Sequence, residues 1–195
     1  VCSSDLKEIK KLCDKLKLNK AGGWDNVSPE HIKYGGDRTI AVLTGLFNCM
    51  LHLETMPKDL KKGVIIPIPK GQKDPVVKDN NRGITLIPVI SKLYEKGLLE
   101  RYLPWSRKNE VIDCLQGAAQ EKCSSVQTTW LLRECISGNI EKDSSVYVGL
   151  LDTKKAFDSV WINGLLYRLY EMKIDGKLWR ILKDMYQDFQ CCVQI

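Results

Sequence analysis

The sequence lacks several patterns that define common classes of protein. No apolar run approaches the roughly 20 residues that span a bilayer, so we expect no membrane helix. No Cys-x-x-Cys pair occurs, and the two histidines, His31 and His52, lie far from any paired cysteines, which argues against a zinc site. The first residues lack the basic-then-apolar layout of a secretion signal, so we expect the eight cysteines to be reduced and mostly buried thiols.

What the sequence does contain is the composition of an ordinary globular protein. Of the 195 residues, 44% are apolar and 28% are charged, which excludes disordered, collagenous and coiled-coil chains. The length suits one domain or slightly more, with a real hydrophobic core. Because the chain starts at Val1 without Met, we expect it to be a piece of a longer protein.

The positive charge is concentrated in one segment. Residues 58–108 hold twelve Lys and Arg against five Asp and Glu, whereas the rest of the chain holds eighteen against nineteen. A solvated protein face explains many charge runs. A basic block interrupted by Pro and Gly is also typical of a surface that faces nucleic acid or a triphosphate, and both interpretations stay open at this point.

The first half of the chain predicts three helices and a β-hairpin. Asp5 with Glu8 can cap a helix that runs to about residue 16, and Ser28-Pro29-Glu30 opens a short helix that stops near Gly35. A longer helix starts at Asp37 and ends before residue 57. Residues 63–69 predict a strand whose prolines place it at an edge or exit position, residues 70–80 a hairpin loop, and residues 82–87 the returning strand. A further helix is expected over residues 88–108.

The second half predicts a buried strand between helices. Ser124 or Ser125 caps a helix that runs to about residue 142. Residues 146–152 are almost continuously apolar until Asp152, which is typical of a buried central strand with a carboxylate at its end. Helices follow at about residues 161–172 and 176–188, and residues 191–195 begin another strand.

Asp152 is the first candidate for chemistry. A carboxylate that closes a buried strand is costly unless a partner or a ligand compensates it. A structural alternative is that Asp152 caps a helix after Thr153. An aromatic residue, Phe157, and a second acid, Asp158, follow closely.

Residues 151–160, Leu-Asp-Thr-Lys-Lys-Ala-Phe-Asp-Ser-Val, resemble the first palm motif of reverse transcriptases in the LDxxKAFDxV form of non-LTR (LINE-type) retrotransposons. Further stretches resemble the same family in the right order: Lys20-Ala21-Gly22-Gly23-Trp24-Asp25 with Glu30, Leu46-Phe47-Asn48 with Pro57, the hairpin around Val64-Ile65-Ile66-Pro67 and Arg82, Ser91-Lys92-Leu93-Tyr94-Glu95-Lys96, and Gln116-Gly117-Ala118 with Thr128. The first loop departs from the family's Gly-Pro-Asp-Gly, since this chain has Gly23-Trp24-Asp25-Asn26.

The resemblance implies a catalytic role for the palm motif. By resemblance Asp152 is the catalytic carboxylate and, with the Thr153 carbonyl, holds the Mg²⁺ ions (Mn²⁺ is an alternative) of a two-metal nucleotidyl transfer. The backbone at Lys155 and Ala156 would face the triphosphate. Phe157 would be the steric gate that favours deoxynucleotides, with a plain core aromatic as the alternative. Asp158 is expected to be a surface or capping acid.

The resemblance also implies substrate contacts in the basic segment. Lys70 and Arg82 would reach the incoming triphosphate, because a guanidinium binds phosphate bidentately and an ammonium supplies a point charge. The alternatives are a solvated lysine for Lys70 and a salt bridge to Asp79 for Arg82. Diffuse contacts to a template or primer backbone, or simple solvation, are expected for four lysines: Lys61, Lys62, Lys73 and Lys78.

The resemblance therefore implies an α+β fold with right-hand polymerase fingers and a partial palm, helix-rich with a finger β-hairpin and an incomplete antiparallel palm sheet. The expected organisation is an N-terminal helical region over residues 1–57, fingers over 58–143 and a partial palm over 144–195. The expected function is a fragment of an RNA-directed DNA polymerase, with an RNA template, a DNA primer and dNTP as partners and no membrane. The working element would act in the cytoplasm and nucleus, and this sequence shows no targeting signal.

Asp-Asp, the acidic pair of the family's second palm motif, occurs nowhere in the sequence. We therefore expect the fragment to be inactive alone. Two alternatives stay open: a non-catalytic nucleic-acid-binding remnant of a retroelement, and an intron-type reverse transcriptase.

Overall fold

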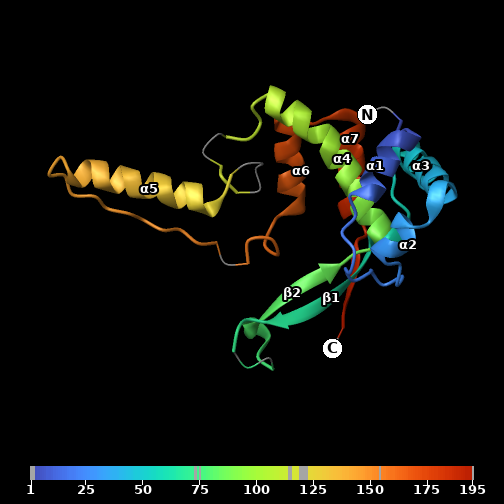
Figure 1. The fold of residues 1–195 in the computed structure, drawn as a ribbon, viewed down its shortest axis with the longest axis horizontal. Helices are drawn as coiled ribbons and strands as arrows, with labels where there is room; N and C mark the ends of the chain where they lie inside the picture. The colour runs from blue at the N-terminus through green and yellow to red at the C-terminus, as the bar shows by residue number, and fades with distance from the viewer. Residues whose placement is uncertain are drawn as a thin grey trace. The chain divides into compact units, whose positions relative to one another are not determined.

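The computed structural model describes residues 3–72, 74, 76–113, 116–118, 123–153 and 155–194. The chain divides into two compact units (Figure 1). The larger unit comprises residues 1–103 and 161–195, and the smaller unit comprises residues 104–160. The described residues combine helices with one three-stranded sheet, which is compatible with the expected α+β class.

The larger unit begins with three helices whose starts follow the expected local signals. They are α1 (Leu6–Asp14), α2 (Pro29–Lys33) and α3 (Gly36–Leu53). Asp5 caps α1, because its Oδ1 accepts a hydrogen bond from the Glu8 amide at 2.7 Å. Ser28 caps α2, and its amide donates to Nδ1 of His31 at 3.0 Å, so that histidine completes a reciprocal capping pair.

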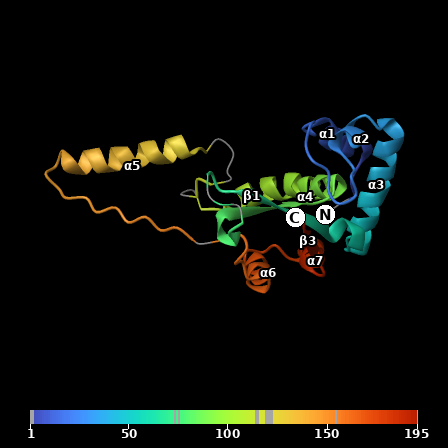
Figure 2. The same ribbon diagram turned by 90° about the horizontal axis from the view of Figure 1, so that it is seen from below.

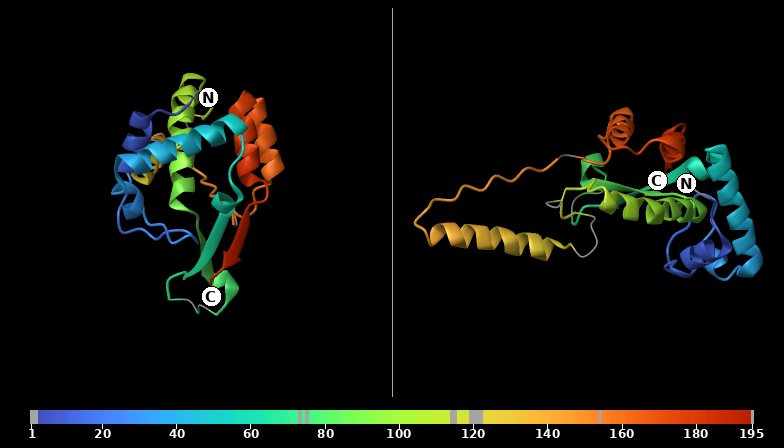
Figure 3. Two further views of the ribbon diagram at one scale, coloured as in Figure 1. Left: turned by 90° about the vertical axis from the view of Figure 1, so that its right-hand side faces the viewer. Right: turned by 90° about the horizontal axis from the view of Figure 1, so that it is seen from above.

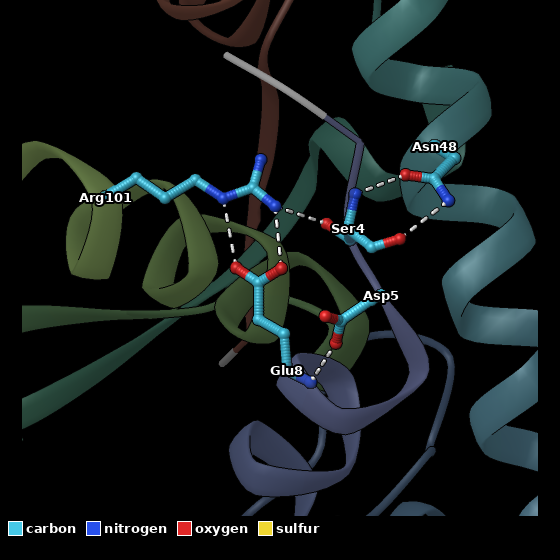
Figure 4. A network of polar contacts seen from close by, with 5 residues as sticks. All are labelled: Ser4, Asp5, Glu8, Asn48 and Arg101. Carbon is cyan, nitrogen blue, oxygen red and sulfur yellow. Dashed lines mark hydrogen bonds and ion pairs between the residues drawn. The ribbon is translucent and has the colours of Figure 1, made fainter.

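Arg101 connects α1 to α4 (Val89–Lys108), whose residues 89–103 belong to this unit, as Figure 4 shows. Its guanidinium binds both carboxylate oxygens of Glu8, at 3.0 and 2.7 Å, and also donates to the Ser4 hydroxyl at 2.8 Å. The backbone of Ser4 is in turn paired with the Asn48 amide on α3. The network fixes three helices relative to one another through a planar, bidentate contact.

The core of the larger unit lies between α1, α3, α4 and the last helix, α7 (Gly176–Tyr186). The rings of Phe47 and Tyr94 pack at its centre with centroids 5.3 Å apart. Helix α6 (Ile162–Glu171) precedes α7 and packs against it, with the Trp179 indole donating to the Leu166 carbonyl at 2.8 Å. Figure 2 shows α6 and α7 side by side.

The sheet of this unit has the order β2-β1-β3. A short 3₁₀ turn, η1 (Lys58–Lys61), leads into β1 (Lys62–Pro69), and a second one, η2 (Lys78–Asn80), precedes β2 (Asn81–Leu86). These two strands form the expected antiparallel hairpin, with Ile68 opposite Arg82. The last strand, β3 (Gln190–Val193), runs parallel to β1 (Figure 3). The resemblance predicts an antiparallel palm sheet for the end of the chain, whereas among the described residues β3 extends the sheet of the hairpin in parallel.

The prolines of β1 explain how a Pro-containing strand can be central. Ile65 faces β3, because its carbonyl accepts the Gln194 amide at 3.0 Å. Pro67 and Pro69 share that side of the strand by the two-residue period, but the pairing with β3 ends at Ile65. Their missing N–H groups therefore interrupt no ladder. The expected edge or exit position is correct for this half of β1, whereas its first half is central.

The smaller unit contains α5 (Ser125–Ile140), which starts at the expected cap. The Ser124 hydroxyl accepts the Gln127 amide, and the Gln127 side chain accepts the Ser124 amide at 3.0 Å. No residue of α5 is buried. After α5 the chain doubles back as an irregular segment (Figure 1).

The expected buried strand at residues 146–152 is wrong. These residues form neither strand nor helix and are exposed, Leu150 to 87%. A continuous apolar run indicates a tendency to be buried, but a strand also needs a neighbour with free N–H and C=O groups. Within the described residues none pairs with this segment.

Two expectations drawn from the composition have different outcomes. No helix among the described residues has the length and apolar character needed to cross a membrane. Of the six described cysteines only Cys13 is buried, so the expectation of mostly buried thiols is wrong. Cys13 lies on the core face of α1, whereas the others fall on surfaces that the periodicity did not assign to the core.

Candidate functional site

Lys70 and Arg82 lie at the distal half of the β1–β2 hairpin. The Lys70 ammonium donates to the Asp79 carbonyl at 2.7 Å, and the Lys70 amide donates to the Asn80 carbonyl at the same distance. Arg82 is exposed on β2, opposite Ile68. Among the described residues the hairpin therefore presents an exposed Arg82, and its Lys70 ammonium bonds to the loop of the hairpin.

Lys61 has a different environment from its neighbours. Its side chain is only 6% exposed, and its ammonium lies 2.8 Å from Oδ2 of Asp184 on α7. The same carboxylate accepts the Met56 amide at 2.6 Å and the Thr55 hydroxyl at 3.2 Å. Burial acts to raise the pKa of Asp184, but the hydrogen bonds from Lys61 and Met56 outweigh it, so the pKa lies below its usual value. Lys61 thus stabilises the junction of η1 and α7.

Lys62, one residue further, is half-buried and lies beside an aromatic ring. Its ammonium is 2.6 Å from Oδ1 of Asp59 and 4.8 Å from the centroid of the Trp24 indole. The indole Nε1 donates to the Asp59 carbonyl at 3.0 Å. Trp24 and Lys62 are thereby joined through one acidic residue on the surface of the larger unit.

The remaining two lysines of the predicted nucleic-acid surface fall between β1 and β2 in the sequence. Lys78 is exposed at the start of η2. Lys73 lies outside the described residues.

Asp152 and Thr153 lie in the exposed irregular segment of the smaller unit. No helix begins there among the described residues, so the alternative role of Asp152 as a helix cap is not supported. A tight turn follows, in which the Ser159 amide donates to the Lys155 carbonyl at 3.0 Å and the Ser159 hydroxyl to the Ala156 carbonyl at 3.2 Å. Lys155 has a left-handed backbone, with φ of 52°. Residues 155–159 of the motif thus form a turn whose side chains are exposed.

Phe157 is 95% exposed at the tip of this turn. The alternative that it is a core aromatic is therefore wrong for this chain. An exposed benzyl side chain is free to contact a ligand, and its role as a gate stays a prediction. Asp158 is also exposed, as expected for a surface acid.

The metal-binding capacity of the described residues is limited. Among them, no three His, Cys, Asp or Glu side chains come close enough to hold a metal ion together. The Asp152 carboxylate is a hard oxygen ligand of the kind that Mg²⁺ prefers. One carboxylate does not make a two-metal centre, so these residues do not by themselves fit the metal pair.

Sequence reasoning missed three polar residues that organise the larger unit. Asp184 is the partner of Lys61, and Arg180 on α7 forms a bidentate pair with Glu54, with 2.7 Å between Nη2 and Oε1. The hydrogen bond from Arg180 lowers the pKa of Glu54. Trp24 is a fourth such residue, and its sequence neighbours predict no role for its indole. The acids and Arg180 lie more than a hundred positions from their partners, so no local signal reveals them.

The chain is similar to RNA-directed DNA polymerases of mobile elements. It is 28% identical over 182 residues to the "RNA-directed DNA polymerase from mobile element jockey" of Drosophila funebris, and 29% identical over 184 residues to that of Drosophila melanogaster. It is 25% identical over 190 residues to the "Probable RNA-directed DNA polymerase from transposon BS" of Drosophila melanogaster. These alignments cover 93%, 94% and 97% of the chain.

The chain spans about a fifth of the length of these relatives, 20%, 20% and 21%. No protein-family model matches it. The relatives are named as RNA-directed DNA polymerases of mobile elements and transposons, so the resemblance predicted from the motifs is confirmed.

Proposed function

We propose that this chain is the fingers and the first part of the palm of a reverse transcriptase from a non-LTR retrotransposon. The observation that carries the proposal is the similarity to mobile-element polymerases over at least 93% of the chain in the relatives described above, together with the palm-type motif around Asp152. In this proposal the fingers span residues 58–143 and the partial palm spans residues 144–195.

The hairpin is proposed to bind the incoming nucleotide. Arg82 is exposed on β2 and is positioned by its register opposite Ile68, so its side chain projects from a rigid two-stranded element. Its planar fork suits a phosphate oxygen pair. Lys70 supports the same role, since its ammonium donates to the Asp79 carbonyl and so places a positive charge at the loop of the hairpin.

The turn after Asp152 is proposed to contribute to the catalytic centre. Asp152 and the Thr153 carbonyl would supply part of the ligand set for two Mg²⁺ ions, in a centre whose other acidic ligands the described residues do not provide. The backbone at Lys155 and Ala156 would lie against the triphosphate, and Phe157 against the sugar. The exposure of the whole turn supports a role in contacting a substrate.

The basic segment is proposed to bind the backbone of template or primer. Lys62, Lys73 and Lys78 are the residues we expect to neutralise phosphates, whereas Lys61 contributes little because its charge is buried against Asp184. The affinity that comes from these phosphate contacts does not depend on base sequence, and it falls as the salt concentration rises because binding releases counterions.

The test compares nucleic-acid binding by matched charge variants of this chain. Replacing Lys62, Lys73 and Lys78 with Gln should weaken binding to single-stranded RNA and flatten the log–log salt slope by about 2, at roughly 0.7 per neutralised phosphate. Replacing Lys7, Lys17 and Lys142, which are exposed and outside the basic segment, removes the same charge and should leave the slope unchanged. Equal slopes in the two variants would place the nucleic-acid surface elsewhere.

The catalytic part of the proposal is tested in a complete polymerase that contains this chain. Asp152→Asn keeps size and hydrogen bonding but removes the charge, so incorporation of every nucleotide should cease while RNA binding persists. The chain alone should extend no primer with Mg²⁺ or Mn²⁺, because the Asp-Asp pair is absent from its sequence. Incorporation by the Asp152→Asn polymerase would overturn the assignment.

A further inference from the structure

Trp24 is presented by a tightly built loop between α1 and α2. A Cβ atom on Gly22 would lie 2.6 Å from the Val27 carbonyl oxygen, and one on Gly23 would lie 2.6 Å from the Pro88 nitrogen. The Asn26 amide donates to the Gly23 carbonyl at 3.1 Å, which closes a turn around the tryptophan. Since only glycine fits at both positions, the loop has little freedom to move Trp24.

The indole itself is held in one orientation. Its only polar group donates to the Asp59 carbonyl at 3.0 Å, so the ring cannot rotate without losing that bond. The Lys62 ammonium lies 4.8 Å from the ring centroid and is itself fixed by Asp59. Yet Trp24 remains 42% exposed. The exposed part of the indole therefore offers an aromatic surface that a ligand can contact.

From this geometry we propose that Trp24 is a stacking platform for one unpaired base of a single-stranded nucleic acid, with Lys62 contacting the adjacent phosphate. The inference rests on the proposed nucleic-acid binding and adds to it a residue that recognises bases and not charge. Stacking on an aromatic ring tolerates any base, since every base has a π face, and a neighbouring cation adds to the attraction.

The position of Lys62 supports this pairing of ring and cation. Lys62 is the first residue of β1, and the same strand leads to Lys70 at its far end and pairs with the strand that carries Arg82. A strand of nucleic acid bound at Trp24 would therefore lie at the base of the hairpin whose distal half carries the proposed nucleotide contacts.

The test separates base stacking from charge with two probes. Binding of the 195-residue chain is measured by fluorescence anisotropy with a labelled oligouridylate and with an abasic sugar–phosphate strand of the same length. Trp24→Ala should weaken binding to oligouridylate about fivefold or more and leave binding to the abasic strand unchanged. The salt slope should stay at its parental value, because no charge is removed.

Two further variants complete the comparison. Trp24→Phe keeps an aromatic face and should retain most of the affinity for oligouridylate. Trp130→Ala removes another exposed tryptophan, on α5, and should change neither affinity. Circular dichroism checks the folding of each variant. If Trp24→Ala does not fold, the parent decides the matter, because equal affinity of the parent for oligouridylate and for the abasic strand overturns the platform.

The outcomes distinguish this inference from the function on which it rests. Salt-dependent binding of the parent that Trp24→Ala leaves intact overturns the platform and keeps the nucleic-acid surface. An equal loss on the abasic strand, or an equal loss in Trp130→Ala, also overturns the platform. Absence of binding by the parent to either strand overturns both proposals.

Discussion

The ion pair between Lys61 and Asp184 allows a sharp test of which lysines serve the fold. Asp184→Asn leaves an ammonium that is 6% exposed without its counter-charge, while the neutral amide still accepts the Met56 N–H. A buried charge without a partner costs about 3–5 kcal/mol. The Asp184 side chain is 24% exposed, so water reaches the pair and we expect a cost at or just below the lower end of that scale, about 2–3 kcal/mol of unfolding free energy.

The reverse substitution should cost less. Lys61→Met keeps an apolar stem of similar volume and leaves Asp184 with the Met56 amide, the Thr55 hydroxyl and solvent. We expect a loss of about 1 kcal/mol. The double variant, Lys61→Met with Asp184→Asn, should be more stable than Asp184→Asn alone, because the orphaned ammonium is removed.

The assay is urea unfolding of the 195-residue chain followed by circular dichroism at neutral pH. Below neutral pH, the pH dependence of the unfolding free energy gives a second test. The pKa of Asp184 is lower in the folded chain than in the unfolded chain. Its carboxylate therefore adds to the unfolding free energy at pH values above its unfolded pKa, and this stabilisation is lost as the pH falls through its folded pKa. The parent should therefore lose more stability on acidification than Asp184→Asn.

The salt dependence of RNA binding should distinguish Lys61 from the lysines that contact phosphate. Lys61→Met should destabilise the chain but keep the parental slope, whereas Lys78→Gln should flatten the slope without destabilising it. The reasoning is refuted if Asp184→Asn costs under about 0.5 kcal/mol, or if the double variant shows simple additivity.

Three further substitutions have defined outcomes in urea unfolding. Tyr94→Phe removes a buried hydroxyl that has no partner among the described residues and keeps the ring packed on Phe47, so the unfolding free energy should stay equal or rise by up to about 1 kcal/mol. Burial raises the pKa of Tyr94 to about 12. The parent should therefore lose stability between about pH 10 and 12, because the unfolded chain ionises first, and the variant should not. Gly23→Ala places a methyl against the Pro88 backbone, which cannot yield as a flexible side chain would, and should cost about 1–3 kcal/mol. Phe157→Ala should change the unfolding free energy by no more than about 0.5 kcal/mol, because the ring is exposed; a larger loss would mean that it is buried in solution.

Local signals in the sequence predicted most of the helices and the hairpin. Asp5 with Glu8, and Ser124 with Gln127, are capping pairs within four residues of each other, so their effect is contained in the sequence window. The alternation and turn residues between β1 and β2 likewise specified an antiparallel pair. These elements need no distant partner to be recognised.

Other features depend on partners far along the chain, and the sequence did not reveal them. The central place of β1 depends on β3, and the burial of Lys61 depends on Asp184. The predicted strand at residues 146–152 failed for the same reason, since its apolar pattern was clear and its pairing partner was assumed. The candidate site was predicted through family motifs, whereas Trp24 stands out only when its loop and neighbours are seen together.

The parallel pairing of β1 with β3 has a consequence for the nascent chain. Synthesis of the residues between Lys62 and Gln190 takes about 6–25 s at about 5–20 residues per second. During that interval the hairpin can close, but the N–H and C=O groups on the other side of β1 have no partner and could recruit a foreign strand. Pro67 and Pro69 offer no N–H donors on that side, so the distal half of β1 is protected from such recruitment throughout. The half ending at Ile65 has no such protection, and its exposure lasts until translation delivers β3.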